Sequence, residues 1–234
     1  MFKMLTAALL LAACGAAAAQ DIDAILRKAD SYRLRESSAQ VDALVQTFKN
    51  GKPDKEKRYQ VLIRPGGKAL VLFRSPGEAG QKVLMSGDDF WMLLPGSARP
   101  IRITPLQKLL GDASTADITN MTWSGDYKGS AMREAEFDGI PCLELELTAL
   151  RKTLSYQRVV LRVARSDYRP LHADLYATSN KRLKQARFSQ DRMVLVDEIQ
   201  TGRETIVTTL ASKPRQFGDE LFNPMYLSRS DAAP

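Results

Sequence analysis

Alternation of apolar and polar residues with a period of two is the feature that most constrains how this chain folds. It is clearest in Leu-Glu-Leu-Glu-Leu-Thr at residues 143–148 and recurs along most of the chain. Such alternation indicates strands with one buried face, and the Gly, Pro, Asn and Asp clusters between the segments indicate turns. The predicted strands are residues 39–49, 56–64, 68–74, 83–86, 90–94, 101–103, 143–148, 156–165, 169–178, 182–190, 192–201 and 203–212.

Two segments break the strand pattern. Residues 20–35 have apolar residues at helical spacing, and residues 104–120 begin with Thr104 as a candidate N-cap and Pro105 at the first helical position. A meander of about eleven antiparallel strands must curl, and these helices can cover its concave side. We therefore expect a mainly β fold, a strongly bent antiparallel sheet or half-open β-barrel with a helical lid. The predicted lid residues are Leu106, Leu109 and Leu110.

The N-terminus has the order of a secretory signal peptide. Lys3 precedes the apolar run Met4–Ala13, and small residues follow. The run is shorter than the roughly 20 residues that span a bilayer. Removal of residues 1–19 would leave one periplasmic domain, residues 20–234, with no linker-like composition shift. Leu11-Ala12-Ala13-Cys14 also fits a lipobox, in which a lipidated Cys14 would anchor the protein to a membrane, and both alternatives stay open.

Composition excludes several kinds of chemistry. One His and two Cys cannot build a His-based metal cage or a disulfide framework. No Gly-rich phosphate loop or Gly-x-Ser-x-Gly elbow is present, so we expect no enzyme, no catalytic residue, no metal and no cofactor. The net charge of +7 comes from 34 basic residues scattered among 27 acidic ones, which argues against a nucleic-acid partner. A basic surface of this kind can favour anionic lipid headgroups.

Several short stretches carry a resemblance to a known family. They are residues 59–65 (YQVLIRP), 87–95 (GDDFWMLLP), 99–103 (RPIRI), 110–114 (LGDAS) and 117–118 (DI). Across residues 21–227 the chain resembles the outer-membrane lipoprotein-sorting protein family, the LolA-like carriers. The resemblance implies a bent sheet closed at one mouth by helices around an apolar cavity.

The function implied by this resemblance is non-catalytic transport. Such a carrier binds acyl chains of lipoproteins or other lipids and moves them through the periplasm toward the outer membrane. Its partners would be an inner-membrane exporter and an outer-membrane acceptor, and it would act as a monomer. The best-known carriers hold the lid with an arginine on an early strand, whereas strand 39–49 of this chain has no Arg. The alternative is an envelope sensor or exporter-accessory module of the same fold, which would bind a protein partner or a lipid signal.

The apolar positions of the predicted strands are the candidates for the cavity wall. On strand 90–94 both faces are apolar, so Phe90, Met92 and Leu94 compete with Trp91 and Leu93 for the inward side. The candidate wall residues are Val61, Ile63, Leu70, Leu72, Phe90, Trp91, Met92, Leu94, Leu143, Leu145 and Leu147.

Overall fold

The computed structural model describes residues 22–34, 36–104, 106–110, 113–118, 122–198 and 202–229, and within them a helix covers residues 22–33. Thirteen antiparallel strands form one sheet in the order β6-β5-β4-β3-β2-β1-β15-β14-β13-β12-β11-β10-β9. These strands are β1 (Ala39–Lys49), β2 (Lys52–Arg64), β3 (Lys68–Phe73), β4 (Lys82–Ser86), β5 (Asp89–Leu93), β6 (Ile101–Ile103), β9 (Tyr127–Phe137), β10 (Ile140–Ala149), β11 (Arg158–Ala164), β12 (Pro170–Tyr176), β13 (Arg182–Ser189), β14 (Arg192–Asp197) and β15 (Arg203–Pro214). The other elements are β7 (Lys108–Leu110), β8 (Ala113–Ser114), α2 (Thr115–Ile118), α3 (Trp123–Asp126), η1 (Pro76–Glu78), η2 (Asp219–Phe222) and η3 (Pro224–Tyr226).

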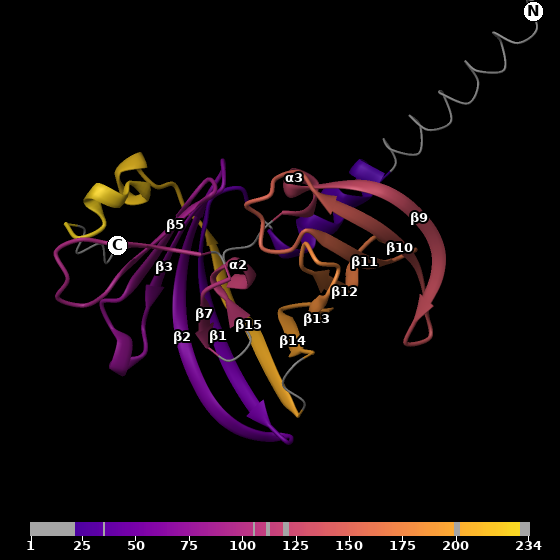
Figure 1. Ribbon diagram of the computed structural model, residues 1–234, viewed down its shortest axis with the longest axis horizontal. Coiled ribbons are helices and arrows are strands. Elements are labelled where there is room, and N and C mark those ends of the chain that lie inside the picture. The colour runs from indigo at the N-terminus through magenta and orange to yellow at the C-terminus, as the bar shows by residue number, and fades with distance from the viewer. Residues whose placement is uncertain are drawn as a thin grey trace, which may run out of the picture.

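Two meanders, β1–β6 and β9–β15, make up the sheet, and the pairing of β1 with β15 joins them. This seam runs from Ala39 opposite Pro214 to Lys49 opposite Arg203. The sheet bends so that β3–β5 and β9–β11 stand on opposite sides of α2 (Figure 1). Within the described residues β6 and β9 are its two end strands, so the sheet is strongly curved and open. The prediction of a bent antiparallel sheet with helices on its concave side is confirmed.

The N-terminal helix packs on the concave side through one stripe of its surface. Ile22, Ile25, Leu26 and Ala29 follow helical spacing and are all at most 4% exposed. The helix reaches β9 at Gly129, where an added Cβ would lie 2.2 Å from Cγ2 of Ile22. Glycine at this strand position therefore allows the helix to approach the sheet backbone.

The same helix also holds the start of α3. The Asp30 carboxylate accepts hydrogen bonds from the backbone N–H of Trp123 at 2.8 Å and from that of Ser124 at 2.9 Å. The Ser124 hydroxyl donates a third bond, at 2.7 Å. Thr122, the local N-cap, makes no side-chain capping bond. Asp30 thus satisfies helix donors that would otherwise lack partners, from a distant part of the chain.

Strand β3 is buried on both faces, which explains why its sequence is continuously apolar. One face, with Ala69 and Val71, belongs to the main core under the helices. The other face packs under the C-terminal segment that contains η2 and η3 (yellow in Figure 1). This second cluster consists of Leu62, Leu70, Leu72, Leu84, Leu93, Phe222 and Leu227, with Trp91, Phe217 and Leu221 packed against it. The two apolar faces of strand 90–94 likewise pack against two different parts of the molecule, the main core and the C-terminal segment.

The outer face of the β9–β15 meander carries a ladder of ion pairs across β10–β13. Arg162 contacts Glu144 at 2.6 Å and Asp174 at 3.1 Å. Arg182 contacts Asp174 at 3.0 Å and Glu198 at 3.0 Å. Many of the basic residues are thus neutralised by cross-strand acids on one face of the sheet.

The structure differs from the prediction in the segment between β6 and β9. Residues 108–110, expected in a helix, form β7 and pair with β8. Among the described residues of the predicted helical segment 104–120, only α2 is helical, and it spans four residues. The two residues between β7 and β8 are Gly111-Asp112, a dipeptide whose sequence favours a hairpin turn over a continuous helix.

Candidate functional site

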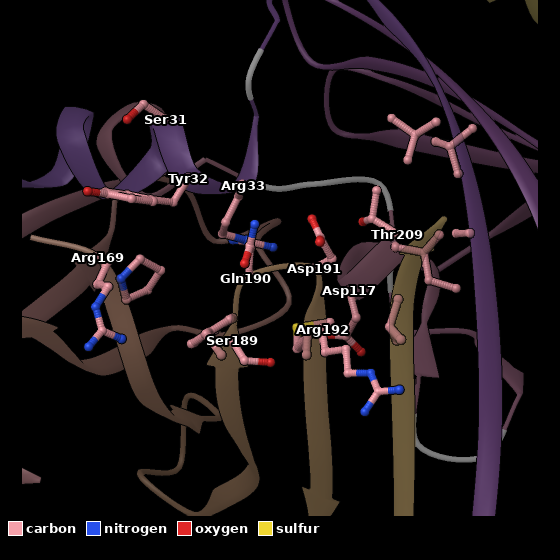
Figure 2. A pocket seen from close by; sticks show the side chains of 18 residues that line it. Ser31, Tyr32, Arg33, Asp117, Arg169, Ser189, Gln190, Asp191, Arg192 and Thr209 are labelled. Carbon is pink, nitrogen blue, oxygen red and sulfur yellow. The ribbon is translucent and has the colours of Figure 1, made fainter. Parts of the chain in front are cut away.

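A cavity of about 470 Å³ lies on the concave side, between the end of the N-terminal helix and the seam strands (Figure 2). We call it the helix cavity. Its volume falls within the range of about 300–1,000 Å³ typical of ligand pockets. Its apolar lining residues are Val41, Ala43, Val61, Ile118, Pro170, Phe188, Met193 and Val207. They come from α2 and from strands of both meanders, so the cavity exists only because β1 and β15 pair.

Polar side chains surround the helix cavity on the side of the turns β11–β12 and β13–β14. Figure 2 labels Tyr32, Arg169, Ser189 and Arg192 around it. Ser189 and Arg192 are exposed, which places them where the cavity meets solvent. An apolar interior with a polar rim suits a molecule that has a hydrocarbon part and a polar end.

Arg33 lies over the inner part of the helix cavity. Its guanidinium carbon is 4.6 Å from the ring centroid of Trp123 and 5.8 Å from that of Phe188. Burial lowers the pKa of Arg33 from its usual value, although Asp30 and Asp117 favour the charged form. Arginine stacks well on aromatic faces, so this cation is held by rings as well as by acids.

Asp117 of α2 is the centre of a buried polar cluster at the wall of the helix cavity. Its carboxylate accepts hydrogen bonds from Lys184 Nζ at 2.8 Å and from the Tyr156 hydroxyl at 2.7 Å. The backbone N–H and hydroxyl of Ser114 donate two more, at 2.8 and 2.7 Å. Burial alone would raise the pKa of Asp117, but Lys184 and Ser114 hold it below its usual value. The cluster connects α2 to β13 and to the β10–β11 loop.

A second cavity of about 620 Å³ lies next to the first along β2, and we call it the turn cavity. It is bounded by the turns at residues 65–68 and 87–88, by α3 and by residues 151–155. The Arg151 side chain lies at the edge of the turn cavity, where it forms ion pairs with Asp88 at 2.9 Å and with Asp126 at 2.6 Å. Its apolar lining residues are Leu34, Ile63, Pro65, Met85, Phe90 and Leu154.

The structure distributes the predicted wall residues over several environments. Val61 lines the helix cavity, and Ile63 and Phe90 line the turn cavity. Met92, Leu143, Leu145 and Leu147 face the helices in the main core but line neither cavity. Leu70, Leu72 and Trp91 lie on the opposite face, under the C-terminal segment, and Leu94 lies beyond β5 and is 44% exposed.

Antiparallel pairing explains this separation. Val61 pairs with Val71, whereas Leu62 pairs with Leu70. Paired residues share a face, so Leu70 and Leu72 lie opposite to Val61 and Ile63. The four residues therefore do not form one wall.

The predicted lid residues do not lie in a helix. Leu106 is 41% exposed, and Leu109 and Leu110 lie in β7 rather than in a helix. Leu106 lines neither the helix cavity nor the turn cavity. Cys14 and the predicted signal peptide lie outside the described residues.

Sequence reasoning missed the polar half of the site. Arg33, Asp117 and the residues of the β13–β14 turn come together only in the folded chain. Arg33 and Asp117 are both charged, and charged residues are usually exposed, so their burial was not predicted. The only signal in the sequence was a charged residue within a predicted helical segment. This signal does not indicate burial, because charged residues are common on the solvent-exposed faces of helices.

Among the described residues, no cluster of three or more His, Cys, Asp or Glu could hold a metal ion. His172 lies on the outer face, with Nδ1 2.9 Å from Arg162 Nη1, and it lines neither cavity. In the described part of the chain, every helix is too short or too polar to traverse a bilayer.

The fold and its two concave cavities place the chain among open, curved β-sheet proteins with helices on the inner face. A LolA superfamily protein from Nitrosomonas europaea is 30% identical, with 89% of this chain and 98% of that chain covered and a TM-score of 0.80. The chain belongs to the LolA superfamily. A family model described as "Uncharacterized protein" matches residues 66–229.

Two more solved structures share the fold at lower identity. A DUF1329 family protein from Desulfovibrio piger is 21% identical, with a TM-score of 0.72 over 89% of this chain and 98% of that chain. A domain from Vibrio parahaemolyticus, assigned to outer membrane lipoprotein sorting, is 21% identical, with a TM-score of 0.67 over 87% and 98%. None of the curated proteins matches the chain.

Proposed function

We propose that this protein is a non-catalytic periplasmic carrier that shields an acyl chain of a lipoprotein or another lipid in the helix cavity. In this proposal residues 1–19 are removed on export and residues 20–234 act as a monomeric carrier domain. An inner-membrane exporter supplies the cargo and an outer-membrane acceptor receives it. The observation that carries the proposal is the apolar cavity of about 470 Å³ between the helices and the seam of the sheet.

The energetics of lipid transfer support this function. Each methylene moved from water into an apolar site contributes about 0.8 kcal/mol, so a carrier needs a dry, concave, apolar surface more than it needs reactive groups. Val41, Ala43 and Val61 offer such a surface, and each is less than 10% exposed. Membership of the LolA superfamily agrees with this use of the fold.

Native mass spectrometry of protein purified from periplasm tests the proposal, and we expect a bound lipid or acyl species. Uptake of a fluorescent acyl probe gives a second readout. Ser189→Trp places a large side chain at the rim of the helix cavity and should weaken uptake about tenfold or more. Ser130→Trp, on the exposed edge strand β9 and away from both cavities, is the matched control.

A lipid-free mass together with no probe uptake by folded wild-type protein would contradict the carrier function. Stable capture of a protein partner by that lipid-free protein would favour the sensor or accessory alternative instead.

A further inference from the structure

The turn cavity and the helix cavity are neighbours on the same concave face. Val61 lines the helix cavity, and Ile63, two residues further on the same face of β2, lines the turn cavity. On the helix side, Arg33 borders the first cavity and Leu34 the second. A branched molecule whose branch point lies near these residues can therefore place one chain in each cavity.

A buried hydroxyl at the wall of the turn cavity has no partner. Ser155 is 7% exposed, and its Oγ makes no hydrogen bond. The other unpartnered buried side-chain atoms among the described residues are Tyr59 OH and Glu78 Oε2, and neither residue lines a cavity described above. Leaving a buried hydroxyl unpaired is unfavourable, and a ligand atom that accepts a hydrogen bond would satisfy Ser155.

The cationic residues of the turn cavity are already paired with carboxylates. Arg64 and Lys68 both contact Asp219, each at 2.7 Å. Arg151 is held by Asp88 and Asp126, as described above. A free anion would have to displace these carboxylates. A neutral acceptor on a hydrocarbon chain fits the cavity better, and an ester carbonyl is such a group.

We propose that the two cavities take the two hydrocarbon chains of one glycerol-based diacyl amphiphile, one chain in each, with Ser155 Oγ donating to an ester carbonyl of the chain in the turn cavity. This inference rests on the proposed carrier function and specifies the class of its cargo. The two-chain glycerol ester occurs in phospholipids and in the diacylglyceryl cysteine of lipoproteins.

Matched tryptophan variants test the occupancy of each cavity. Ser37 and Ser189 are exposed serines that line the turn cavity and the helix cavity respectively. The variants are Ser37→Trp, Ser189→Trp, the double variant and the Ser130→Trp control. The probes are palmitate, dipalmitoyl phosphatidylglycerol and a dipalmitoyl-glyceryl-cysteine lipopeptide, each read by native mass spectrometry and by binding titration.

We expect the wild-type protein to bind two palmitates or one diacyl molecule. Each single variant should retain one palmitate and lose about tenfold or more in affinity for the diacyl probes, because one chain is left in water. The double variant should bind neither kind of probe, and Ser130→Trp should behave as wild type. Comparison of the phospholipid with the lipopeptide shows which source of the diacyl group is preferred.

The ester contact has its own test. Ser155→Ala should weaken binding of the dipalmitoyl phospholipid about threefold to tenfold, the range expected for one hydrogen bond. It should leave binding of the corresponding diether lipid, which lacks the ester carbonyls, unchanged. Equal effects on ester and ether lipids would overturn the role of Ser155.

The outcomes separate this inference from the proposed function. If Ser37→Trp binds the diacyl probes as wild type while Ser189→Trp does not, the helix cavity alone holds the cargo and the two-chain inference is wrong. If the wild-type protein binds none of the three probes, the carrier function itself is wrong.

Discussion

Asp117 is the residue on which the polar contacts inside the sheet converge. Its carboxylate receives hydrogen bonds from a lysine, a tyrosine and a serine that belong to three different segments. Asp117 and Lys184 are at most 7% exposed, so each charge depends on the other for compensation. Such a cluster gives α2 one defined position against β13.

Replacement of Asp117 by asparagine tests the cluster. The amide would keep the size of the side chain but remove the charge that Lys184 contacts, and we expect the free energy of unfolding to fall by about 3–5 kcal/mol. Urea denaturation measures the change. Asp219→Asn, in an exposed ion pair, should have a much smaller effect, and adding Lys184→Met to Asp117→Asn should recover part of the loss. A loss from Asp117→Asn no larger than that from Asp219→Asn would contradict this role.

His172, the chain's single histidine, should make stability depend on pH. Burial lowers its pKa, with Arg162 and Arg187 acting in the same direction and Asp174 and Gln185 opposing them. The unfolded chain therefore takes up a proton at higher pH than the folded one. The contribution of His172 to the free energy of unfolding is fully present above its unfolded-state pKa of about 6.5. This contribution is lost as the pH falls below that value. Urea midpoints between about pH 7.5 and 5 should show a weaker decline in His172→Asn. An identical decline in both proteins would exclude His172 as its source.

At the scale of elements, the position of the N-terminal helix depends on small and specific contacts with the sheet and α3. Its apolar stripe fills the concave side, Gly129 provides the close approach and Asp30 caps α3. The C-terminal segment has the matching role on the opposite face, where Phe222 and Leu227 cover β2–β4. Both ends of the described chain thus cover an apolar surface of the same sheet.

Gly129→Ala tests the helix contact. The added methyl would lie within 2.2 Å of Ile22, so the helix must shift, and overpacking of this kind usually lowers stability by about 1–3 kcal/mol. We expect faster hydrogen exchange in residues 22–33 as well. Gly77→Ala is the control, because its Cβ meets nothing within 4 Å and its φ is ordinary. Unchanged exchange in the helix of Gly129→Ala would mean that the contact does not hold it.

At the scale of the whole molecule, Arg151 connects the two meanders across the concave face. It reaches from the β10–β11 loop to Asp88 in the β4–β5 turn, although β4 and β10 are far apart in the sheet order. The bent sheet therefore has a contact across its opening as well as the hydrogen-bonded seam between β1 and β15.

Arg151→Ala should loosen that opening without unfolding the sheet. The ion pairs are partly exposed, so the free energy of unfolding should change by about 1 kcal/mol or less. Hydrogen exchange at the β4–β5 turn should become faster, and high salt should have a similar effect on wild type. Arg165→Ala, which removes an exposed pair with Glu134, should leave that turn unchanged. Unaltered exchange in Arg151→Ala would show that Arg151 does not restrain the turn.

Most of the fold was predictable because period-two alternation is local. The predicted strands on either side of the seam correspond to the observed ones, and the N-terminal helix lies within residues 20–35 as expected. The candidate site was predictable only in part. Val61, Ile63 and Phe90 line cavities, but alternation alone could not show that Leu70 and Leu72 lie on the opposite face.

The sequence by itself determined that this chain forms a large, curved antiparallel sheet with a helix before it, since each strand's pattern follows from its own residues. Only the tertiary structure decided which face each apolar strand turns to the helices, where the helix cavity and the turn cavity lie, and which charges are buried beside them. Arg33, Asp117 and Lys184 come from distant segments. Their proximity depends on the β1–β15 pairing and on the bend of the sheet, and neither is encoded in any single segment.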